Sequence, residues 1–424
     1  MVKIVSFKIR FLGGVKEVGR VGIAVKTRKV QLLMDYGVML SHEPGFPMHV
    51  PSNEVDGVIL THSHLDHSGA VPVFHIQNGK PVYGNTLTFE LAQLLISDFI
   101  HLSGYYLPFE FIELQSMMRK CVHLNFRETT TVGDIRFQLL NAGHIPGSAQ
   151  ILVEADGKRV LYTGDFNTVN TRLLQRADTD YGELDAVIME STYADEDHSD
   201  RSSLEKKFVE HVTEIVEGGG TVLVPSFAVG RSQEIACVLA AHNFKYSVTV
   251  DGMIREVSRI MMNHMDYLRD PKLFKDAMRL ATFVKRRKDR KLATKKPGAI
   301  ISTAGMLKGG PAVFYISKLG GKSRNGVFLV SYQIPGTPGR ELLEKGVCVM
   351  DGRMRKIKAQ VEHFDFSSHC GAGELQETVK NLEGNPTVYV VHGAEGNCKR
   401  FAKWIRRETG LKAVAPKAGA AYTI

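Results

Sequence analysis

The most informative stretch of this chain is Thr61-His62-Ser63-His64-Leu65-Asp66-His67-Ser68-Gly69-Ala70. It follows the apolar run Gly57–Leu60, which predicts a short buried strand. Alternate residues of an extended segment face the same way, so His62 and His64 can bind one cation together. Once the chain turns into a helix, Asp66 and His67 point to the other side, where they can bind a second cation. The stretch therefore predicts half of a dinuclear metal site.

Other metal-binding and acid–base side chains recur at the ends of predicted strands: His144, Asp165, Glu190, His369 and His392. Strands that repeatedly end in such residues indicate one sheet edge focused on one site. With the first stretch, they supply three histidines for one cation, two histidines and a carboxylate for the other, and an aspartate to bridge them. Imidazole and carboxylate ligands without thiolate suit zinc, with manganese as the alternative.

Two cations in such a site would lie about 3.5–4 Å apart, activate a bridging water and stabilise an in-line displacement at phosphorus. His369 and Glu190 remain outside the ligand set, and a histidine paired with a carboxylate can protonate a leaving oxygen. Asp35 ends the predicted strand Val30–Met34 and has two interpretations of equal weight. It can support a metal-ligating histidine through a hydrogen bond, or it can close a turn.

The rest of the chain predicts an α/β protein of two parts. Residues 1–196 and 356–424 carry hairpin strands followed by helices, which favours a layered sandwich over a barrel. Residues 197–355 alternate between helical and strand patterns. This alternation predicts an inserted α/β domain, in which a parallel sheet has helices on both faces.

Two glycine-rich loops of the inserted domain are candidate phosphate sites. They follow apolar runs at residues 299–301 and 327–330, at the strand ends where α/β domains bind ligands. Exposed amides and nearby cations suit RNA phosphate oxygens, and the candidate residues are Lys308, Gly309, Gly310, Ser331 and Arg340. The basic run Lys285–Lys291 is either a sequence-independent phosphate contact or a solvated surface segment.

Composition narrows the cellular setting. A net charge of +9 hints at a polyanionic partner. The five cysteines are scattered and form no C-x-x-C pair, which favours reduced thiols. The chain has neither a signal-peptide pattern nor a run of about eighteen apolar residues. We therefore expect a soluble cytoplasmic protein with no membrane partner.

The spacing from His62 to His67 matches the H-x-H-x-D-H hallmark and resembles the metallo-β-lactamase superfamily. Essentially the whole chain resembles its β-CASP ribonucleases, which implies an αββα sandwich with an inserted β-CASP α/β domain. Glu190-Ser191-Thr192-Tyr193 is similar to motif A of that family, Ser368-His369 to motif B, and Val391-His392-Gly393 to motif C.

Within that family, the chain resembles the archaeal cleavage and polyadenylation specificity factor homologues without KH domains, and the related archaeal ribonuclease J proteins. The shared stretches are Phe11–Arg20, Gly305–Pro311 and Tyr332-Gln333. The chain starts directly with the catalytic domain, so we expect RNA docking to use the two domains present.

The resemblance implies two zinc ions that share an aspartate, and a general acid held by a carboxylate. The ligands would be His62, His64 and His144 for the first zinc, Asp66, His67 and His392 for the second, and Asp165 between them. The catalytic residues would be Asp66, His369 and Glu190, with His369 as the acid for the leaving ribose oxygen.

It also implies a ribonuclease that hydrolyses single-stranded RNA as an endonuclease, a 5′–3′ exonuclease or both, in RNA processing or decay. A histidine at motif C accompanies RNA-processing members, so His392 favours RNA over the alternative of a DNA nuclease. Two positions depart from the family pattern: Gly371 replaces an aspartate after motif B, and Ala394 precedes Glu395 in motif C. By resemblance, a homodimer and a place in an RNA-processing complex are expected.

Two other classes of protein compete with this interpretation. A small-molecule hydrolase on the same metal scaffold has no need of so large an inserted domain. A non-catalytic processing subunit would be expected to have lost ligands, whereas each expected ligand position is filled. We therefore expect an enzyme that holds its RNA strand in a cleft between the metal domain and the inserted domain.

Overall fold

The computed structural model describes residues 7–40, 43–77, 79–103, 106–334, 336–350 and 352–424. Pro335 of the second glycine-rich loop lies outside the described residues. The chain divides into two compact units. The first comprises residues 1–170, 176–197 and 369–424, and the second comprises residues 171–175 and 198–368.

Two seven-stranded sheets form the centre of the first unit. The first sheet has the order β22 (Ala421–Thr423), β1 (Lys8–Gly13), β2 (Gly22–Lys26), β3 (Gln31–Tyr36), β4 (Gly57–Ile59), β5 (Val82–Gly84), β6 (Cys121–His123). The second has the order β21 (Ala413–Val414), β20 (Glu383–Val391), β11 (Glu183–Glu190), β10 (Lys158–Tyr162), β9 (Ala149–Ala155), β8 (Ile135–Asn141), β7 (Thr130–Val132).

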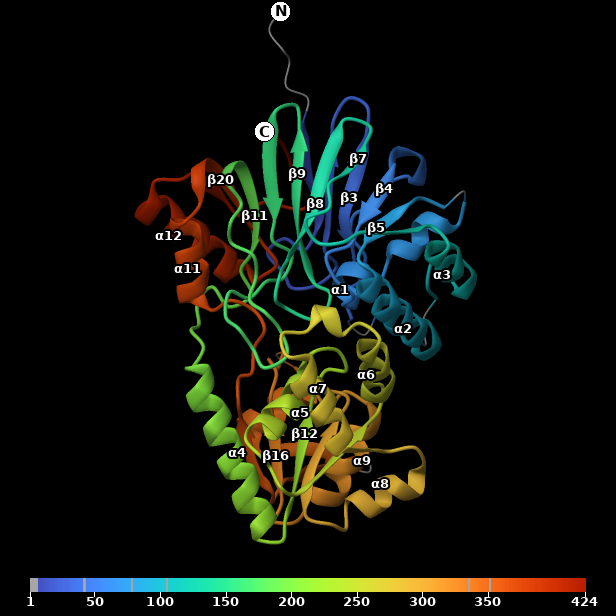
Figure 1. Cartoon of the computed structure of the whole chain (residues 1–424), viewed down its shortest axis with the longest axis vertical. Helices are drawn as coiled ribbons and strands as arrows, with labels where there is room; N and C mark the ends of the chain where they lie inside the picture. The colour runs from blue at the N-terminus through green and yellow to red at the C-terminus, as the bar shows by residue number, and fades with distance from the viewer. Residues whose placement is uncertain (1–6, 41–42, 78, 104–105, 335, 351) are drawn as a thin grey trace, which may run out of the picture. The chain divides into compact units, whose positions relative to one another are not determined.

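Side-chain alternation explains the layers of this unit. On β3, Leu32 and Met34 join a core shared with the second sheet, whereas Leu33 belongs to a core with the helices outside the first sheet. The helices beside the first sheet are α1 (Leu65–Ser68), α2 (Thr86–Leu102) and α3 (Phe111–Met118). Those beside the second are α11 (Ala372–Lys380) and α12 (Glu395–Thr409). Figure 1 shows the resulting αββα order, which confirms the predicted sandwich.

Strand direction brings the ligand-bearing loops together at one edge of the second sheet. β10, β11 and β20 are parallel, with Tyr162 opposite Ile188 and Glu190 opposite Val391. β9 is antiparallel to both β10 and β8, so β8 ends at the same edge as β10. The loops after β8, β10 and β20, together with the last residue of β11, therefore meet on this edge.

The second unit is built on a six-stranded sheet in which every described pairing is parallel. Its order is β14 (Ala281–Phe283), β13 (Ser247–Asp251), β15 (Gly298–Ser302), β12 (Thr221–Pro225), β16 (Gly326–Leu329), β19 (Gln360–His363). A two-stranded hairpin, β17 (Val347–Met350) and β18 (Arg353–Lys356), stands apart from it. The parallel sheet confirms the α/β prediction.

Helices cover both faces of this sheet. On β16, Val327 and Leu329 pack in a core with α9, whereas the ring of Phe328 lies 6.2 Å from that of Phe208 on α4. The helices of the unit are α4 (Arg201–Glu217), α5 (Arg231–Ala241), α6 (Ile254–Met262), α7 (Pro271–Leu280), α8 (Arg287–Ala293), α9 (Gly310–Leu319) and α10 (Pro338–Lys345). Among the described residues, short 3₁₀ turns occur at Ser52–Glu54 and Val71–His75 in the first unit and at Met265–Tyr267 in the second.

The boundary predicted at residue 355 differs from the observed one. The second unit continues to Ser368 because β19 extends its parallel sheet, with Val327 of β16 opposite Val361. Residues 356–368 therefore pack with the inserted domain and not with the C-terminal part of the sandwich. Strand pairing of this kind depends on partners far away in the sequence, so local patterns do not reveal it.

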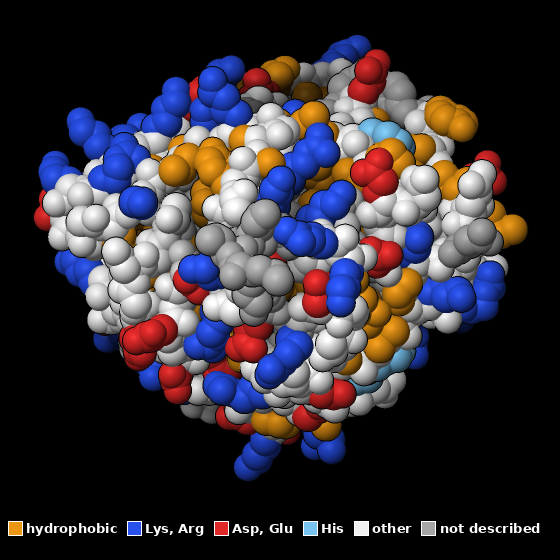
Figure 2. Space-filling model, turned by 90° about the horizontal axis from the view of Figure 1, so that it is seen from above, with side chains coloured by type: hydrophobic (Ala, Val, Ile, Leu, Met, Phe, Trp, Pro, Cys, Tyr) orange, Lys and Arg blue, Asp and Glu red, His pale blue; other side chains and the backbone are white. Residues whose placement is uncertain are grey.

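On the face shown in Figure 2, Lys and Arg side chains are dispersed and mixed with Asp and Glu. This face alone therefore does not single out an anion-binding surface. Within the described residues, none of the helices combines the length and the apolar character that crossing a bilayer requires.

Candidate metal centre

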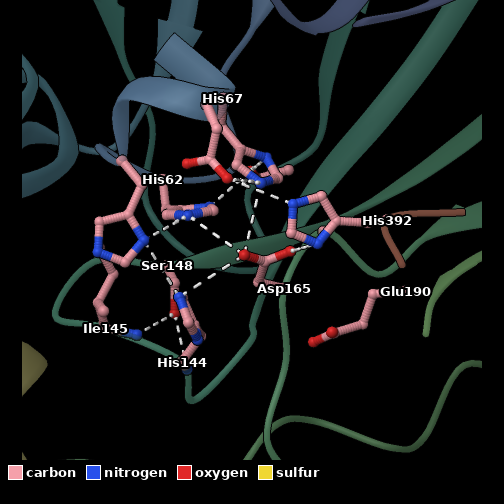
Figure 3. Close-up of polar contacts among 12 residues, drawn as sticks. His62, His67, His144, Ile145, Ser148, Asp165, Glu190 and His392 are labelled. Carbon is pink, nitrogen blue, oxygen red and sulfur yellow. Dashed lines mark hydrogen bonds and ion pairs between the residues drawn. The ribbon is translucent and has the colours of Figure 1, made fainter. Parts of the chain in front are cut away.

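Four side chains from the two sheets form a first ligand group: His62, His64, His144 and Asp165. Nδ1 of His64 lies 3.2 Å from Nε2 of His62 and 3.3 Å from Nε2 of His144. Oδ2 of Asp165 lies 3.7 Å from Nε2 of both His62 and His144. Figure 3 shows His62, His144 and Asp165 pointing toward a common centre.

A second ligand group lies beside the first and comprises Asp66, His67 and His392. Nε2 of His392 lies 3.3 Å from Oδ2 of Asp66. Asp165 also borders this group, because its Oδ2 lies 3.4 Å from Nε2 of His67 and its Oδ1 lies 3.2 Å from Nδ1 of His392. Asp165 is thus the one carboxylate of the seven ligand candidates that contacts histidines of both groups.

Buried hydrogen bonds orient the histidines of the motif. Nδ1 of His67 lies 2.7 Å from Oδ2 of Asp35, which leaves its Nε2 directed at the cluster. Nδ1 of His62 lies 3.0 Å from the hydroxyl of Thr61. Asp35 also accepts hydrogen bonds from the hydroxyls of Thr61 and Tyr162, at 2.7 and 3.0 Å. The geometry favours the first of the two interpretations of Asp35, as a support for a ligand.

Close backbone packing places the second ligand group. The amide of His392 donates to the carbonyl of Gly14 at 2.7 Å, and the amide of Val21 donates to the carbonyl of Asp66 at 2.8 Å. A Cβ at Gly37 would lie 1.7 Å from the carbonyl oxygen of Asp66, so only glycine fits there. The loop after β1 and the turn after β3 therefore hold ligands from both ends of the chain.

The pKa shifts within the cluster follow from the burial of its side chains and from the contacts between its histidines and carboxylates. Burial lowers the pKa of His62 well below its usual range and that of His64 to about 4, so both are neutral near pH 7. Burial would also lower the pKa of His67, but neighbouring carboxylates outweigh it and raise that pKa. For Asp165, burial is outweighed by the neighbouring histidines, which hold its pKa well below the usual range.

The residues present fit a pair of divalent cations. Nε2 of His67 and Oδ1 of Asp165 are buried and make no hydrogen bond, and both face the cluster. A buried polar atom without a well-aligned hydrogen bond is costly, and a bound cation would satisfy both atoms better than the neighbouring side chains do. The donor atoms are imidazole nitrogens and carboxylate oxygens, which suit zinc.

His369 and Glu190 lie at the border of the cluster. Nδ1 of His369 lies 2.8 and 2.9 Å from the two carboxylate oxygens of Glu190. Glu190 is buried and also accepts a hydrogen bond from the amide of Phe166 at 2.9 Å. The ring of His369 lies 4.4 Å from that of His144, measured between centroids. The pair therefore lies beside the candidate ligands, and its role as a general acid stays a prediction.

Three supporting residues were not identified from the sequence: Thr61, Tyr162 and Thr192. The hydroxyl of Thr192 lies 3.3 Å from Nδ1 of His392 and donates to its carbonyl at 3.1 Å. Thr61 lies two residues after β4 and directly before His62, and Tyr162 ends β10 three residues before Asp165; these positions were the available signal. Their partners are distant in sequence, so only the structure reveals their contacts.

The five phosphate-site candidates all lie in the second unit. Lys308, Gly309 and Gly310 precede or begin α9, and Lys308 is exposed. The two glycine-rich loops contact each other, because the amide of Gly339 donates to the carbonyl of Met306 at 3.0 Å. Ser331 is buried and its hydroxyl makes no hydrogen bond, whereas Arg340 donates to Glu344 at 2.6 Å. The structure thus groups the loops but engages Arg340 with a carboxylate.

Comparison with protein families matches three segments of the chain. Residues 40–206 match the metallo-beta-lactamase superfamily, residues 232–342 match the Beta-Casp domain, and residues 354–416 match the "Zn-dependent metallo-hydrolase RNA specificity domain".

Curated relatives and a solved structure give the same picture. The chain is 40% identical to "RNase aCSPSF2" of Saccharolobus solfataricus, over 98% of this chain and 85% of that protein. It is 35% identical to "Probable RNase MJ4" of Methanocaldococcus jannaschii, over 97% and 99%. It is 32% identical to "Transcription termination factor FttA" of Pyrococcus abyssi, over 96% and 70%. A crystal structure of a protein of unknown function from Enterococcus faecalis shares the fold, with a TM-score of 0.64, 14% identity and coverage of 99% and 100%.

Proposed function

The chain belongs to the β-CASP branch of the metallo-β-lactamase superfamily, together with archaeal proteins named RNases, and we propose that it is a zinc-dependent ribonuclease. The observation that carries this proposal is the convergence of seven ligand-type side chains with a carboxylate-bound histidine beside them. A scaffold that only binds RNA has no need of either feature.

The proposed ligand sets follow the two groups in the structure. His62, His64 and His144 would hold one zinc, Asp66, His67 and His392 the other, and Asp165 would bridge them. Manganese is the alternative metal. When bound, two such cations supply the Lewis acidity that activates water and stabilises the charge developing at phosphorus.

The chain's own acid would be His369. Glu190 binds its Nδ1 through both carboxylate oxygens, which fixes the ring and stabilises its protonated form. A protonated His369 would give its proton to the ribose oxygen that leaves when the phosphodiester bond breaks. Burial of Glu190, at 1% exposure, keeps water from competing for this carboxylate.

RNA is the proposed substrate, in processing or decay in the cytoplasm. Two relatives are named RNases, and residues 354–416 match the RNA specificity domain. The identity to the RNase of Saccharolobus, 40%, exceeds the 32% to the termination factor of Pyrococcus abyssi, which favours a nuclease of general RNA metabolism. A single strand suits a site whose ligands are mostly buried, and cleavage is internal, from the 5′ end, or both.

The test replaces Asp66 and His67 together by alanine and uses end-labelled RNA, with DNA of the same sequence in parallel. We expect the variant to lose RNA cleavage and the wild type to leave DNA intact. Product lengths from the wild type separate internal from 5′–3′ cleavage. Retained RNA cleavage by the variant would refute the metal mechanism.

Because the double variant loses two proposed ligands and could misfold, a second variant is needed to separate loss of chemistry from loss of structure. His369→Ala removes the acid and leaves all seven ligand candidates in place. It should bind zinc like the wild type and cleave slowly. If both variants bind RNA but the wild type cleaves none, the chain is a non-catalytic subunit.

The proposal has two further parts, an RNA contact and an oligomeric state. RNA phosphates would contact the glycine-rich loops through Lys308, Gly309, Gly310, Ser331 and Arg340, and Lys308→Ala should then weaken RNA binding. A homodimer follows from the resemblance to archaeal relatives alone, and light scattering of the purified protein would measure its mass.

A further inference from the structure

The second unit contains a cavity that the proposed metal chemistry does not use. It has a volume of about 340 Å³ and lies among α6, α7 and β14, the first two labelled in Figure 1. Its apolar lining comes from Met262, Met278 and Phe283. The volume is at the lower end of the range of small-ligand sites, and an aromatic ring lies in its wall.

Four basic side chains surround this apolar lining: Arg255, Arg259, Lys275 and Arg279. They are two pairs spaced four residues apart on α6 and α7, and such residues share one face of a helix. Met262 lies three residues after Arg259 on α6, and Met278 lies three residues after Lys275 on α7, so each methionine shares the helix face that lines the cavity. The two amphipathic helices therefore place cations around an apolar floor.

These cations remain available to a ligand. Glu256 binds both arginines of α6 at 3.0 Å, yet 46% and 69% of the side chains of Arg255 and Arg259 stay exposed. Arg279 lies 3.8 Å from Asp276 and is 69% exposed. Exposed ion pairs of this kind are weak, so an incoming anion can compete with the carboxylates.

The basic run noted in the sequence begins directly after this cavity. Phe283 ends β14, and Lys285, Arg286, Arg287 and Lys288 follow it and are exposed. Arg290 of the same run is different, because it binds both oxygens of Asp251 at 2.6 and 2.9 Å. That contact anchors α8 beside the sheet and keeps the exposed cations next to Phe283.

We propose that this cavity is an accessory RNA-binding subsite, in which one base of a single strand packs against Phe283 while flanking phosphates bind the four rim cations. The proposal rests on the proposed function, since it supplies the RNA that the enzyme would hold. Single-strand sites combine an aromatic platform with a basic track for the backbone, and both features are present here. An acidic protein segment would use the cations but has no particular need of the aromatic ring.

The test measures binding apart from cleavage. A fluorescent RNA of about 12 nucleotides is titrated with the full chain in excess chelator, where a metal-dependent nuclease cannot cut it. Arg259→Ala/Arg279→Ala should weaken binding about tenfold and lower the slope of log K against log salt by about 1.4, or about 0.7 for each lost phosphate contact. Phe283→Leu keeps an apolar side chain but loses the ring, and should weaken binding about fivefold with an unchanged salt slope.

A matched control removes the same charge elsewhere in the unit. Lys206 and Lys207 are exposed on α4, and their double replacement by alanine should leave RNA affinity unchanged. Wild-type affinity in all three variants would overturn the subsite, even if the enzyme cleaves RNA. An arginine effect without a Phe283 effect would also overturn it and would indicate an acidic or purely electrostatic partner. If the predicted losses occur in a protein that cleaves no RNA, the subsite stands and the nuclease proposal fails.

Discussion

Oδ2 of Asp35 lies 2.7 Å from Nδ1 of His67, and both side chains are fully buried. Asp35 lies near the end of β3 and His67 lies in α1, yet this contact sets which nitrogen of His67 faces the candidate metal centre. A histidine held in this way presents its other nitrogen at a fixed angle and with greater basicity. We therefore expect Asp35 to support the candidate site without being a ligand.

We expect Asp35→Asn to weaken metal binding about 10- to 100-fold. Asparagine has the same shape and tolerates the positive φ of 58° at this position, so the change isolates the carboxylate charge. Competition with a coloured chelator measures the affinity. Asp56→Asn is the matched control, because Asp56 is exposed and accepts a hydrogen bond from Gln31 away from the cluster. Unchanged affinity in Asp35→Asn would assign Asp35 to turn closure.

The contact between His369 and Glu190 predicts that the effects of replacing each residue on kcat are not additive. Either His369→Ala or Glu190→Gln should lower kcat about 100-fold or more, with metal content unchanged. The double variant should be no slower than His369→Ala, because the two residues act as one unit. Steady-state kinetics with metal analysis measures this. Loss of metal in Glu190→Gln would instead make Glu190 a ligand, which its place beside Asp165 and His392 would explain.

Replacing Gly37 by alanine should weaken metal binding, because the added Cβ would displace the backbone of two proposed ligands. A Cβ there would lie 1.7 Å from the carbonyl oxygen of Asp66 and 2.4 Å from the amide of His67, so Gly37→Ala must displace two proposed ligands. We expect a cost of about 1–3 kcal/mol in unfolding free energy and a reduced zinc content. At Gly321 an added Cβ would meet nothing within 4 Å, and Gly321→Ala should change neither quantity. Full zinc occupancy in Gly37→Ala would contradict the prediction.

The buried carboxylate of Glu234 should make the stability of the second unit depend on pH. Burial alone would raise its pKa, but Arg201 and the amides of Arg172 and Leu173 outweigh burial and lower it. A carboxylate with a lowered folded pKa contributes stability above its unfolded value of about 4.5, and this contribution is lost as the pH falls through the folded value. We expect Glu234→Gln to lower the Tm by about 5 °C near pH 7.

The difference in Tm between the wild type and Glu234→Gln should shrink on acidification from pH 7 through the lowered folded pKa of Glu234, because the wild-type carboxyl then also becomes neutral. Calorimetry across that range measures it. Glu344→Gln removes an exposed partner of Arg340 and should leave the Tm within about 1 °C. A difference that stays constant with pH would show that packing, and not charge, is what Glu234 supplies.

Local patterns in the sequence were sufficient for most elements of the fold. The strand predicted at Gly57–Leu60 contains β4, Gly57–Ile59, and the strand predicted at Val30–Met34 overlaps β3, Gln31–Tyr36. Periods of two and of about 3.6 residues follow from backbone geometry, so they can be recognised without knowing the partners. The positions of histidines and aspartates at strand ends were visible for the same reason.

Pairings between distant residues could not be obtained in this way. The extension of the inserted domain to Ser368 depends on β19 lying beside β16, and the cavity at Phe283 depends on the side chains of α6, α7 and β14 lining one space. No local periodicity records which strand or helix becomes a neighbour. Sequence analysis could therefore name the loops of the second unit but did not identify this cavity.

The sequence by itself determined the kinds of atoms that the centre contains, because imidazole and carboxylate groups stand after strands whatever the fold. Only the tertiary structure decided how they are used. It turns Nδ1 of His64 toward Nε2 of both His62 and His144, and it places Asp165 against both histidine groups. The physical reason is that ligand geometry depends on distances between segments, and folding sets those distances through packing far from the motif itself.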